Sequence, residues 1–468
     1  MSVSGIPPEL PVGWAWTTLG EVVEVLDHLR VPVSVQERTK RLGGVPYYGA
    51  TGKVGWIDEA IFNEDLILLG EDGVQFFDAD KPKAYVISGP SWVNNHAHVL
   101  RPLTGFIDQR YLTYYLNHFN YEGFANGTTR LKLTKSAMIR IPVALPPLAE
   151  QKRIAAALEE QLSRLDVASG TLDVSGRRIE RYLKAVLHRM TSAYETVRLQ
   201  EVLASGLTNG RSVPTRAGGF PVLRLTALSD SNVDLGQYKE GDWGADEAEP
   251  FLVRKGDFLI SRGNGSLSLV GRGALVVDTP APIAYPDTMI RVRSDVNKIL
   301  PEYLHTVWSS LAVRRQIESQ ARTTAGIYKV NQKILGAIEF PLPNVPTQRA
   351  LCAQWSETEQ QARHLTRTVS VSKRRSATLR RSLLAEAFSG RLAPQDVSDE
   401  PADVLAARIS AEREASEATK PRRRSPRRAP AQRKRVEDAA PAPNGTPPPR
   451  ADTPILATQP TLDLEIPS

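Results

Sequence analysis

The sequence predicts an α+β protein in which two similar globular units are separated by two long helices. Three observations lead to this fold class. A long helical pattern in the middle of the chain recurs near its end, apolar residues along it are spaced by about seven, and the segments before each copy read as short strands separated by glycines.

The repeat keeps a single offset. Gln151 and Gln348 are 197 residues apart, and the same offset carries Leu187 to Leu384 without a gap. Chance similarity rarely keeps one offset across a whole helix, so the pattern indicates a duplicated unit. Two ordinary amphipathic helices packed inside separate domains are the alternative interpretation.

The apolar spacing of both copies is close to a heptad, which is typical of a coiled-coil seam. The seam predicted in the first copy consists of Ile154, Leu158, Leu162, Leu165, Leu172, Ile179, Leu183 and Val186, and that in the second of Leu351, Trp355, Leu365, Val369, Leu379 and Leu383. Ser169, Gly170 and Gly176 weaken the first helix. A helix of about 44 residues spans roughly 65 Å, which suits a spacer better than a globular core.

Changes in composition divide the chain into five segments. They are a first globular unit at 1–145, a first long helix at 146–195, a second globular unit at 196–340, a second long helix at 341–394 and a mostly disordered tail at 395–468, in which 401–420 could form a short helix. The globular units are related more loosely than the helices. Asp65-Leu-Ile-Leu matches Asp257-Phe-Leu-Ile, and Tyr111-Leu matches Tyr303-Leu, both at a shift of 192 residues.

Composition excludes several classes of protein. The 468 residues contain no apolar run long enough to span a membrane, and the N-terminus lacks the pattern of a signal peptide. The single Cys352 excludes an internal disulfide and a cysteine-based metal site. A cytoplasmic protein is therefore expected.

The formal net charge of +7 suits a polyanionic partner such as nucleic acid. Eight of the basic residues lie at 422–435, in the Pro- and Arg-rich tail, so the remainder of the chain is close to neutral. This tail could bind phosphates without sequence preference, or it could simply be a solvated segment.

Motifs of catalysis are missing from the sequence. There is no Gly-x-x-x-x-Gly-Lys-Ser/Thr phosphate loop and no Asn/Asp-Pro-Pro-Tyr/Phe motif of the kind that adenine methyltransferases carry. His96 and His98 alternate as on a strand, but no third ligand lies near them in sequence, so no metal site is expected. The chain is predicted to be non-catalytic.

Candidate DNA contacts combine hydroxyl, amide and cationic side chains in glycine-rich loops, which suits phosphates and base edges. In the first unit these candidates are Tyr48, Thr51, Lys53, Asn94, Asn95, Thr128, Thr129, Arg130 and Lys132. In the second unit they are Arg262, Asn264, Ser266, Arg322, Thr323, Thr324, Tyr328 and Lys329. Each could instead be a solvated loop residue, and the asparagines could cap a turn.

The chain resembles the specificity subunits of type I restriction-modification systems over nearly all of residues 10–394. The stretches that carry the resemblance are Leu10-Pro-Val-Gly-Trp, Leu145-Pro-Pro-Leu-Ala-Glu-Gln-Lys-Arg-Ile, Gly256-Asp-Phe-Leu-Ile-Ser-Arg-Gly-Asn-Gly-Ser with Val270-Gly271, and Ser382-Leu-Leu-Ala-Glu-Ala-Phe-Ser-Gly-Arg-Leu. The chain departs from the family pattern before the second helix, where it reads Pro-Asn-Val-Pro-Thr-Gln, and in its long basic tail.

The resemblance implies that each globular unit is a target recognition domain reading one half of a split site in double-stranded DNA. The long helices would pair antiparallel, related by a pseudo-twofold axis, set the spacing between half-sites and dock two methyltransferase subunits. Those subunits would use S-adenosylmethionine, and two further motor-nuclease subunits would use ATP and Mg; this chain would hold no cofactor. A two-domain protein-binding adaptor with a coiled-coil spacer, and a stand-alone enzyme, are the rival hypotheses.

Overall fold

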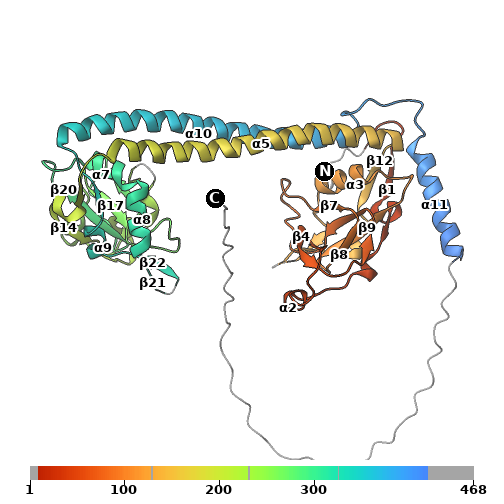
Figure 1. Ribbon diagram of the computed structural model, residues 1–468, viewed down its shortest axis with the longest axis horizontal. Coiled ribbons are helices and arrows are strands. Elements are labelled where there is room, and N and C mark those ends of the chain that lie inside the picture. Colours follow the sequence, from red (N-terminus) through yellow and green to blue (C-terminus); the bar gives the residue numbers. More distant parts are fainter. Residues whose placement is uncertain (1–8, 128–129, 230–231, 325, 420–468) are drawn as a thin grey trace, which may run out of the picture. The chain divides into compact units, whose positions relative to one another are not determined.

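The computed structural model describes residues 9–127, 130–229, 232–324 and 326–419 of the chain. Two long helices, α5 (Leu148–Thr191) and α10 (Val345–Phe388), lie side by side (Figure 1) within the segments predicted to be helical, and each has 44 residues. Among the described residues, no helix combines the length and the apolar character that a membrane span requires.

Polar contacts define how α5 and α10 pair. Asp166 forms an ion pair with Arg380, and Asp173 forms one with Lys373. Between these two levels, the hydroxyl oxygens of Ser169 and Ser376 lie 3.1 Å apart. The residue numbers of the partners increase along α5 as they decrease along α10, so the helices are antiparallel.

The burial of α5 follows the predicted seam, whereas that of α10 departs from it. Leu158, Leu162 and Val186 are buried, but Leu365 and Leu379 are 53% and 50% exposed. The prediction that these two leucines lie in the seam is therefore wrong. Smaller residues of α10, among them Ala362 and Ser376, are the ones that turn inward, and Leu379 is adjacent to Arg380 beside the seam.

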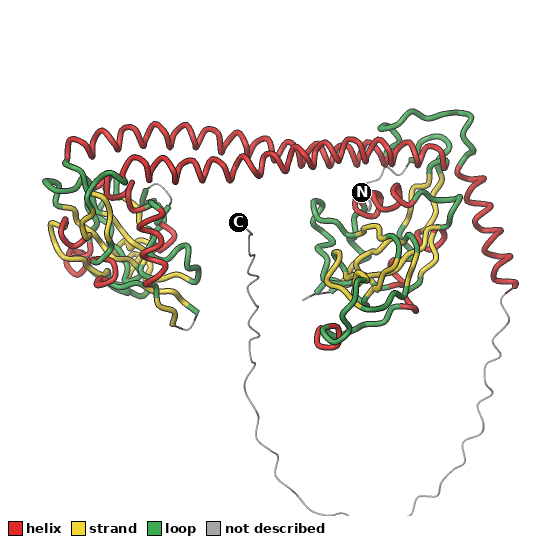
Figure 2. The backbone as a smooth tube through the Cα atoms, viewed as in Figure 1, coloured by secondary structure: helices red, strands yellow, loops and turns green. Residues whose placement is uncertain are grey.

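The first domain is built on two four-stranded sheets, drawn in yellow in Figure 2. One has the order β2 (Val23–Val25), β9 (Ala97–Pro102), β6 (Leu66–Gly70), β7 (Ala84–Ile87), and the other β4 (Gly52–Ile57), β3 (Val45–Gly49), β8 (Pro90–Val93), β5 (Phe62–Asn63). Every residue of β6 is buried, as expected for a continuous apolar run. The rest of the first domain consists of two strand pairs and several short helices. The strand pairs are β1 (Ala15–Thr18)–β12 (Pro142–Leu145) and β10 (Ala125–Asn126)–β11 (Lys132–Leu133). The helices are α1 (Leu19–Val22), η1 (Asp27–Leu29), α2 (Val35–Arg38), α3 (Gln109–His118) and α4 (Lys135–Met138).

The second domain contains a sheet with the corresponding strand order, β14 (Leu203–Asn209), β20 (Met289–Ser294), β17 (Phe258–Ser261), β19 (Gly273–Leu275). Its other strands form β13 (Thr196–Arg198)–β23 (Glu339–Pro341), β15 (Thr215–Leu223)–β16 (Tyr238–Gly241) and β18 (Gly263–Asn264)–β22 (Ile327–Lys329)–β21 (Arg322–Thr324). Its helices are η2 (Leu199–Val202), η3 (Leu225–Ala227), α6 (Ala245–Ala248), η4 (Glu249–Phe251), α7 (Pro301–Trp308), α8 (Leu311–Gln320) and α9 (Gln332–Gly336).

Strand pairing corrects the predicted alignment of the two domains by one residue. Leu69 pairs with His98 in the first domain, and Ile260 pairs with Ile290 in the second. Position 98 matches 290 at the predicted shift of 192, but position 69 then matches 260 at a shift of 191. A slip of one residue would turn every side chain of the strand to the opposite face, so core burial determines the register that the motif match missed.

A glutamine anchors the start of each long helix by equivalent hydrogen bonds. Gln151 accepts from the Asp108 N–H (2.8 Å) and donates to the carbonyl oxygens of Phe106 (3.2 Å) and Pro146 (2.9 Å). The side chains of Gln151 and of Gln348, its counterpart in α10, are fully buried, so such bonds satisfy amide groups whose burial without partners would cost free energy.

In the second domain, Gln348 accepts from the Leu300 N–H and donates to the carbonyl oxygens of Lys298 and Pro343, each at 2.8 Å. The two helix starts are thus built in the same way.

Beyond α10 the chain folds back onto the first domain. Arg153 pairs with Asp399 at 2.6 Å, and the N–H of Ala402 donates to the carbonyl of Gly13. α11 (Ala402–Thr419) begins there and buries Leu405 and Ile409 in the first-domain core. The short helix expected at 401–420 is present, and residues 420–468 of the predicted disordered tail lie outside the described residues.

Replacing Gly170 with alanine should stabilise the protein by about 1 kcal/mol, because alanine is the better helix former and a Cβ there meets open space. Denaturant unfolding followed by circular dichroism would measure the change. Gly123→Ala is the matched control: its Cβ also meets open space, but its φ of +81° disfavours alanine, so it should destabilise. A loss of stability in Gly170→Ala would contradict the prediction.

Candidate nucleic-acid interface

The predicted contacts around residue 50 lie on the hairpin formed by β3 and β4. Thr51 is exposed in its turn, and the Lys53 ammonium lies 4.1 Å from the ring centroid of Trp56. Tyr48 is half-buried against Tyr85, with ring centroids 6.1 Å apart. The hairpin therefore presents a hydroxyl and a cation to solvent, while Tyr48 serves partly as a packing residue.

Asn94 and Asn95 lie beside this hairpin because β3 pairs in parallel with β8. The Asn94 N–H donates to the Tyr48 carbonyl at 3.0 Å, and the Asn94 side-chain oxygen accepts from the His96 N–H at 2.8 Å. The structure thus gives Asn94 the turn-capping role that was the alternative to base contact. Asn95 is exposed.

The next two predicted cations lie on the β10–β11 hairpin, and each has a carboxylate partner. Arg130 pairs with Asp72 at 2.6 Å, and Lys132 pairs with Glu71 at 2.9 Å. Both cationic side chains are more than half exposed, whereas the carboxylates are largely buried. Thr128 and Thr129, also predicted here, lie outside the described residues.

In the second domain the three-stranded sheet β18–β22–β21 joins two groups that the sequence placed 60 residues apart. Asn264, Tyr328 and Thr323 are opposite one another across its strands, and so are Gly263, Lys329 and Arg322. Because paired residues share a face, Lys329 and Arg322 lie on the other face from Tyr328 and Thr323.

The remaining predicted residues flank this sheet. Ser266 lies in the loop after β18, where its N–H donates to the Asn264 side chain, and its hydroxyl contacts Ser268. Arg262 precedes β18, and its guanidinium lies 3.4 Å from the Asp287 carbonyl. Thr324 ends β21.

A second set of cations, absent from the predicted contacts, lies in the first domain on Arg38 and Arg41. The Arg38 guanidinium lies 4.4 Å from the ring centroid of Tyr47, and that of Arg41 lies 4.7 Å from that of Trp92. Such contacts hold a guanidinium in a fixed orientation near the surface. Tyr47 is 1% exposed and supports the Arg38 guanidinium from the core side. The only sequence signal was the cluster of basic residues at 38–41.

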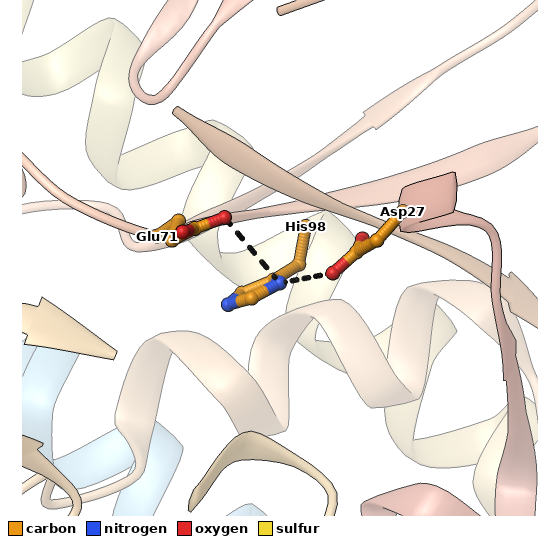
Figure 3. Close-up of side chains that lie close together, drawn as sticks. All are labelled: Asp27, Glu71 and His98. Atoms are coloured by element: carbon orange, nitrogen blue, oxygen red, sulfur yellow. Dashed lines mark hydrogen bonds and ion pairs between the residues drawn. The ribbon is translucent and has the colours of Figure 1, made fainter. Parts of the chain in front are cut away.

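Beneath the β10–β11 hairpin lies a buried group of Asp27, Glu71 and His98 (Figure 3). His98 Nδ1 is 2.6 Å from the Asp27 carboxylate and 3.9 Å from that of Glu71. His98 Nε2 lies 2.8 Å from the carbonyl oxygen of Leu133, in β11. The imidazole thereby connects η1, β9 and the hairpin.

The hydrogen bonds of His98 link the ring to a carboxylate and to a backbone carbonyl. A carbonyl oxygen can only accept, so Nε2 carries a proton toward Leu133. Burial by itself raises the pKa of Asp27, but the hydrogen bond and charge of His98, the Val99 N–H and the Arg30 guanidinium outweigh it and leave the pKa below its ordinary value.

Glu71 belongs to the same network. Burial raises the pKa of its carboxyl group, but hydrogen bonds from Arg30 and Lys132 bring the pKa below its ordinary value. Arg30 lies 2.7 Å from Glu71 and 3.4 Å from Asp27. The two largely buried carboxylates are therefore balanced by an arginine and a lysine, and His98 is hydrogen-bonded to Asp27.

This group contains the residue types of a metal site, and Asp27 and Glu71 were not predicted as neighbours of His98. The geometry favours a charge network instead. His98 Nε2 is committed to Leu133, and the Arg30 guanidinium lies against both carboxylates, where it would repel a cation. His96, expected to share a face with His98, contacts Asp72 at 2.8 Å instead.

The second domain carries no such group at the matching positions. Strand pairing places Ile290 opposite Ile260, where the first domain has His98 opposite Leu69. The N–H of Arg262 donates to Thr288 and its carbonyl accepts from Val330, as the backbone of Glu71 does with His96 and Leu133. One backbone frame thus supports different side chains in the two domains.

Comparison with known proteins agrees with this architecture. Residues 11–171 match the family model described as type I restriction modification DNA specificity domain. The chain is 28% identical over 348 residues to the EcoKI specificity subunit of Escherichia coli strain K12, covering 68% of this chain and 74% of that protein. It is 26% identical over 333 residues to the StySPI specificity subunit of Salmonella potsdam, covering 67% and 71%.

A solved structure has the same fold. It comes from work on complex assembly and conformational transition of a type I restriction-modification system, and it covers 82% of this chain and 100% of its own, with a TM-score of 0.61 and 18% identity. The chain therefore has a two-domain α+β fold. Residues 11–171 match the type I restriction modification DNA specificity domain, and about two thirds of the chain is similar to type I specificity subunits, which agrees with the resemblance that the sequence motifs predicted.

The lowered pKa of Asp27 predicts a pH-dependent stability. Its carboxylate stabilises the fold above its ordinary pKa of 3.8, and this contribution disappears as the pH falls through the lower folded-state value. Asp27→Asn should therefore cost about 3 kcal/mol near pH 7, and the difference from wild type should shrink toward pH 3.

Thermal unfolding between pH 3 and pH 7 would test this difference. Asp58→Asn is the control, because Asp58 pairs with Arg41 at the exposed surface and its loss should matter little. A difference for Asp27→Asn that stays constant with pH would show that the ionised carboxylate is not what stabilises the network.

Proposed function

We propose that this chain is the non-catalytic DNA-recognition subunit of a type I restriction-modification complex, with each domain reading one half of a split double-stranded target. The observation that carries the proposal is a shared strand order beneath different polar surfaces. The first domain presents Arg130 and Lys132 beside a buried charge network, whereas the second presents Lys329 and Arg322 on a small sheet. Two related frames with different surfaces suit two different half-sites.

In this proposal α5 and α10 form a coiled coil that sets the spacing between half-sites, and an internal pseudo-twofold repeat relates the two halves of the chain. The antiparallel contacts Asp166–Arg380, Ser169–Ser376 and Asp173–Lys373 support a fixed register between the helices. The matching bonds of Gln151 and Gln348 support the repeat.

The outer faces of the helices would dock two methyltransferase subunits. Val167 is 69% exposed on α5, and the ion pair between Asp166 and Arg380 brings it level with Leu379 on α10. Tyr182 is 58% exposed and matches Leu379 at the repeat offset of 197 residues. Exposed apolar residues in such positions suit protein partners, and the repeat would provide two equivalent sites.

The chemistry would belong to these partners in the cytoplasm. The methyltransferase subunits would supply S-adenosylmethionine and methylate adenine, and two motor-nuclease subunits would use ATP and Mg for restriction. This chain would contribute the choice of sequence and no cofactor.

Mapping methylated bases tests the proposal directly. Genomic DNA would be compared between hosts that make the candidate methyltransferase with and without this chain. We expect a new split motif, methylated on both strands, only when the chain is present. No new motif, with both proteins folded and associated, would favour the protein-binding adaptor.

Exchanging residues 196–339 for the same region of a relative with a different target should change only one half of the methylated motif. The physical reason is that each domain has its own core and its own polar surface. The same base mapping measures the outcome, with an exchange of 1–145 as the reciprocal control. A change in both halves would contradict modular recognition.

Deleting one heptad of α5, residues 170–176, should alter or abolish the spacing between half-sites without altering their sequences. The deletion removes two helical turns, or about 10 Å, including Asp173 and its pairing with Lys373. Base mapping again gives the result, and Gly170→Ala is the control for a change within that segment. An unchanged spacing would show that α5 does not set it.

A further inference from the structure

The guanidinium of Arg130 lies against the Asp72 carboxylate and the backbone of Gly73 in the first domain, and we call this position the arginine seat. Its Nη2 lies 2.6 Å from the Asp72 carboxylate, and a Cβ added to Gly73 would come within 2.9 Å of the same nitrogen. The Asp72 side chain is 15% exposed, whereas that of Arg130 is 59% exposed. Asp72 therefore holds the guanidinium from behind while the other side of the side chain faces solvent.

The seat is tied to the folded core. Asp72 also contacts His96 Nδ1 at 2.8 Å, and the backbone of Asp72 bridges to Lys132. The N–H of Leu133 donates to Glu71 at 2.8 Å, and the Leu133 carbonyl accepts from the buried His98. The segment after β6 that carries Asp72 and the strand β11 are thus both held by the charge network of Asp27, Glu71 and His98, so the position of Arg130 is set before any ligand binds.

Charge argues for a neutral ligand at this seat. Asp72 compensates the Arg130 cation and would repel a phosphate group approaching the same guanidinium. The remaining N–H donors of the fork are still available, and the N7 and O6 atoms of guanine are neutral acceptors that a fixed arginine binds in bidentate fashion. A side chain oriented in advance also loses less entropy on binding.

The matching position of the second domain lacks this seat. At the repeat offset of 197 residues, Arg130 corresponds to Ile327, which is 43% exposed at the start of β22. Lys132 corresponds to Lys329, and their strands pair in the same way with residues 72 and 263. The arginine seat is therefore particular to one half of the molecule.

We propose that Arg130, held by Asp72, reads one guanine of the half-site bound by the first domain. Arg130 is then a specificity-determining residue, and Asp72 is its positioning residue. This inference rests on the proposed function, since it requires that the first domain reads DNA.

The test uses the full chain assembled with its methyltransferase partners and starts from the methylated motif of the wild type. If the wild-type complex methylates no split motif, the proposed function itself is wrong, and that result is obtained before any variant is tested. Given a motif, Arg130→Ala should lose discrimination at a single G·C pair of one half-site, by about 10- to 100-fold in methylation rate against the other bases. The other half-site should stay unchanged.

Two further variants separate base reading from a folding defect. Arg130→Lys keeps the charge but loses the planar fork, so it should relax the same base pair. Asp72→Ala should also relax that pair, while its affinity for DNA without the motif stays equal or rises because a negative charge is removed. Arg140→Ala, an exposed arginine in the same domain that donates to the Ser136 carbonyl, is the charge-matched control and should leave the motif unchanged.

Two different results for Arg130→Ala would contradict guanine reading. If Arg130 contacts only a phosphate, Arg130→Ala will weaken binding equally to all sequences and reduce the salt dependence by about one counterion, with the motif intact. If the pair with Asp72 is only structural, Arg130→Ala will lower the melting temperature of the complex without changing base preference. Either result overturns the proposal.

Discussion

The junction between each long helix and its domain depends on one buried glutamine. Gln151 and Gln348 each tie the first turn of a helix to two carbonyl oxygens and one N–H of the neighbouring loops. An apolar replacement would leave all three backbone groups unsatisfied in the interior, which is more costly than the loss of a surface contact. The direction of each helix relative to its own domain therefore follows from a few hydrogen bonds, and the helix pairing builds on that direction.

The first domain adds a second constraint, a set of buried charges that balance one another. Asp27 and Glu71 would be costly to bury alone, and Arg30 and Lys132 compensate their charge while His98 hydrogen-bonds to Asp27. Because His98 also bonds to Leu133, the network fixes a hairpin at the surface as well as the core. The second domain fills the matching strand position with Ile290, so similar frames can support unlike surfaces.

Much of the candidate interface could be predicted by residue type, but its grouping could not. Glycine-rich loops with cations and hydroxyls identified the residues near 50, 130, 264 and 328, whose DNA contacts stay predictions. The pairing of Asn264 with Tyr328 depends on strand register, and the support of Arg38 by Tyr47 depends on a side-chain contact between separate elements. No local pattern in the sequence records either contact. The exposed positions of Leu365 and Leu379 were missed for a similar reason, since periodicity does not say which face of a helix its partner covers.

The sequence by itself determined the positions of the long helices and the resemblance to a family, because periodicity and motifs are local properties of the chain. Only the tertiary structure decided which carboxylates surround His98, which residues face outward on α10 and how the strands of the two domains align. Those outcomes depend on contacts between residues far apart in sequence. Burial and charge balance select among such contacts only once the whole core is assembled.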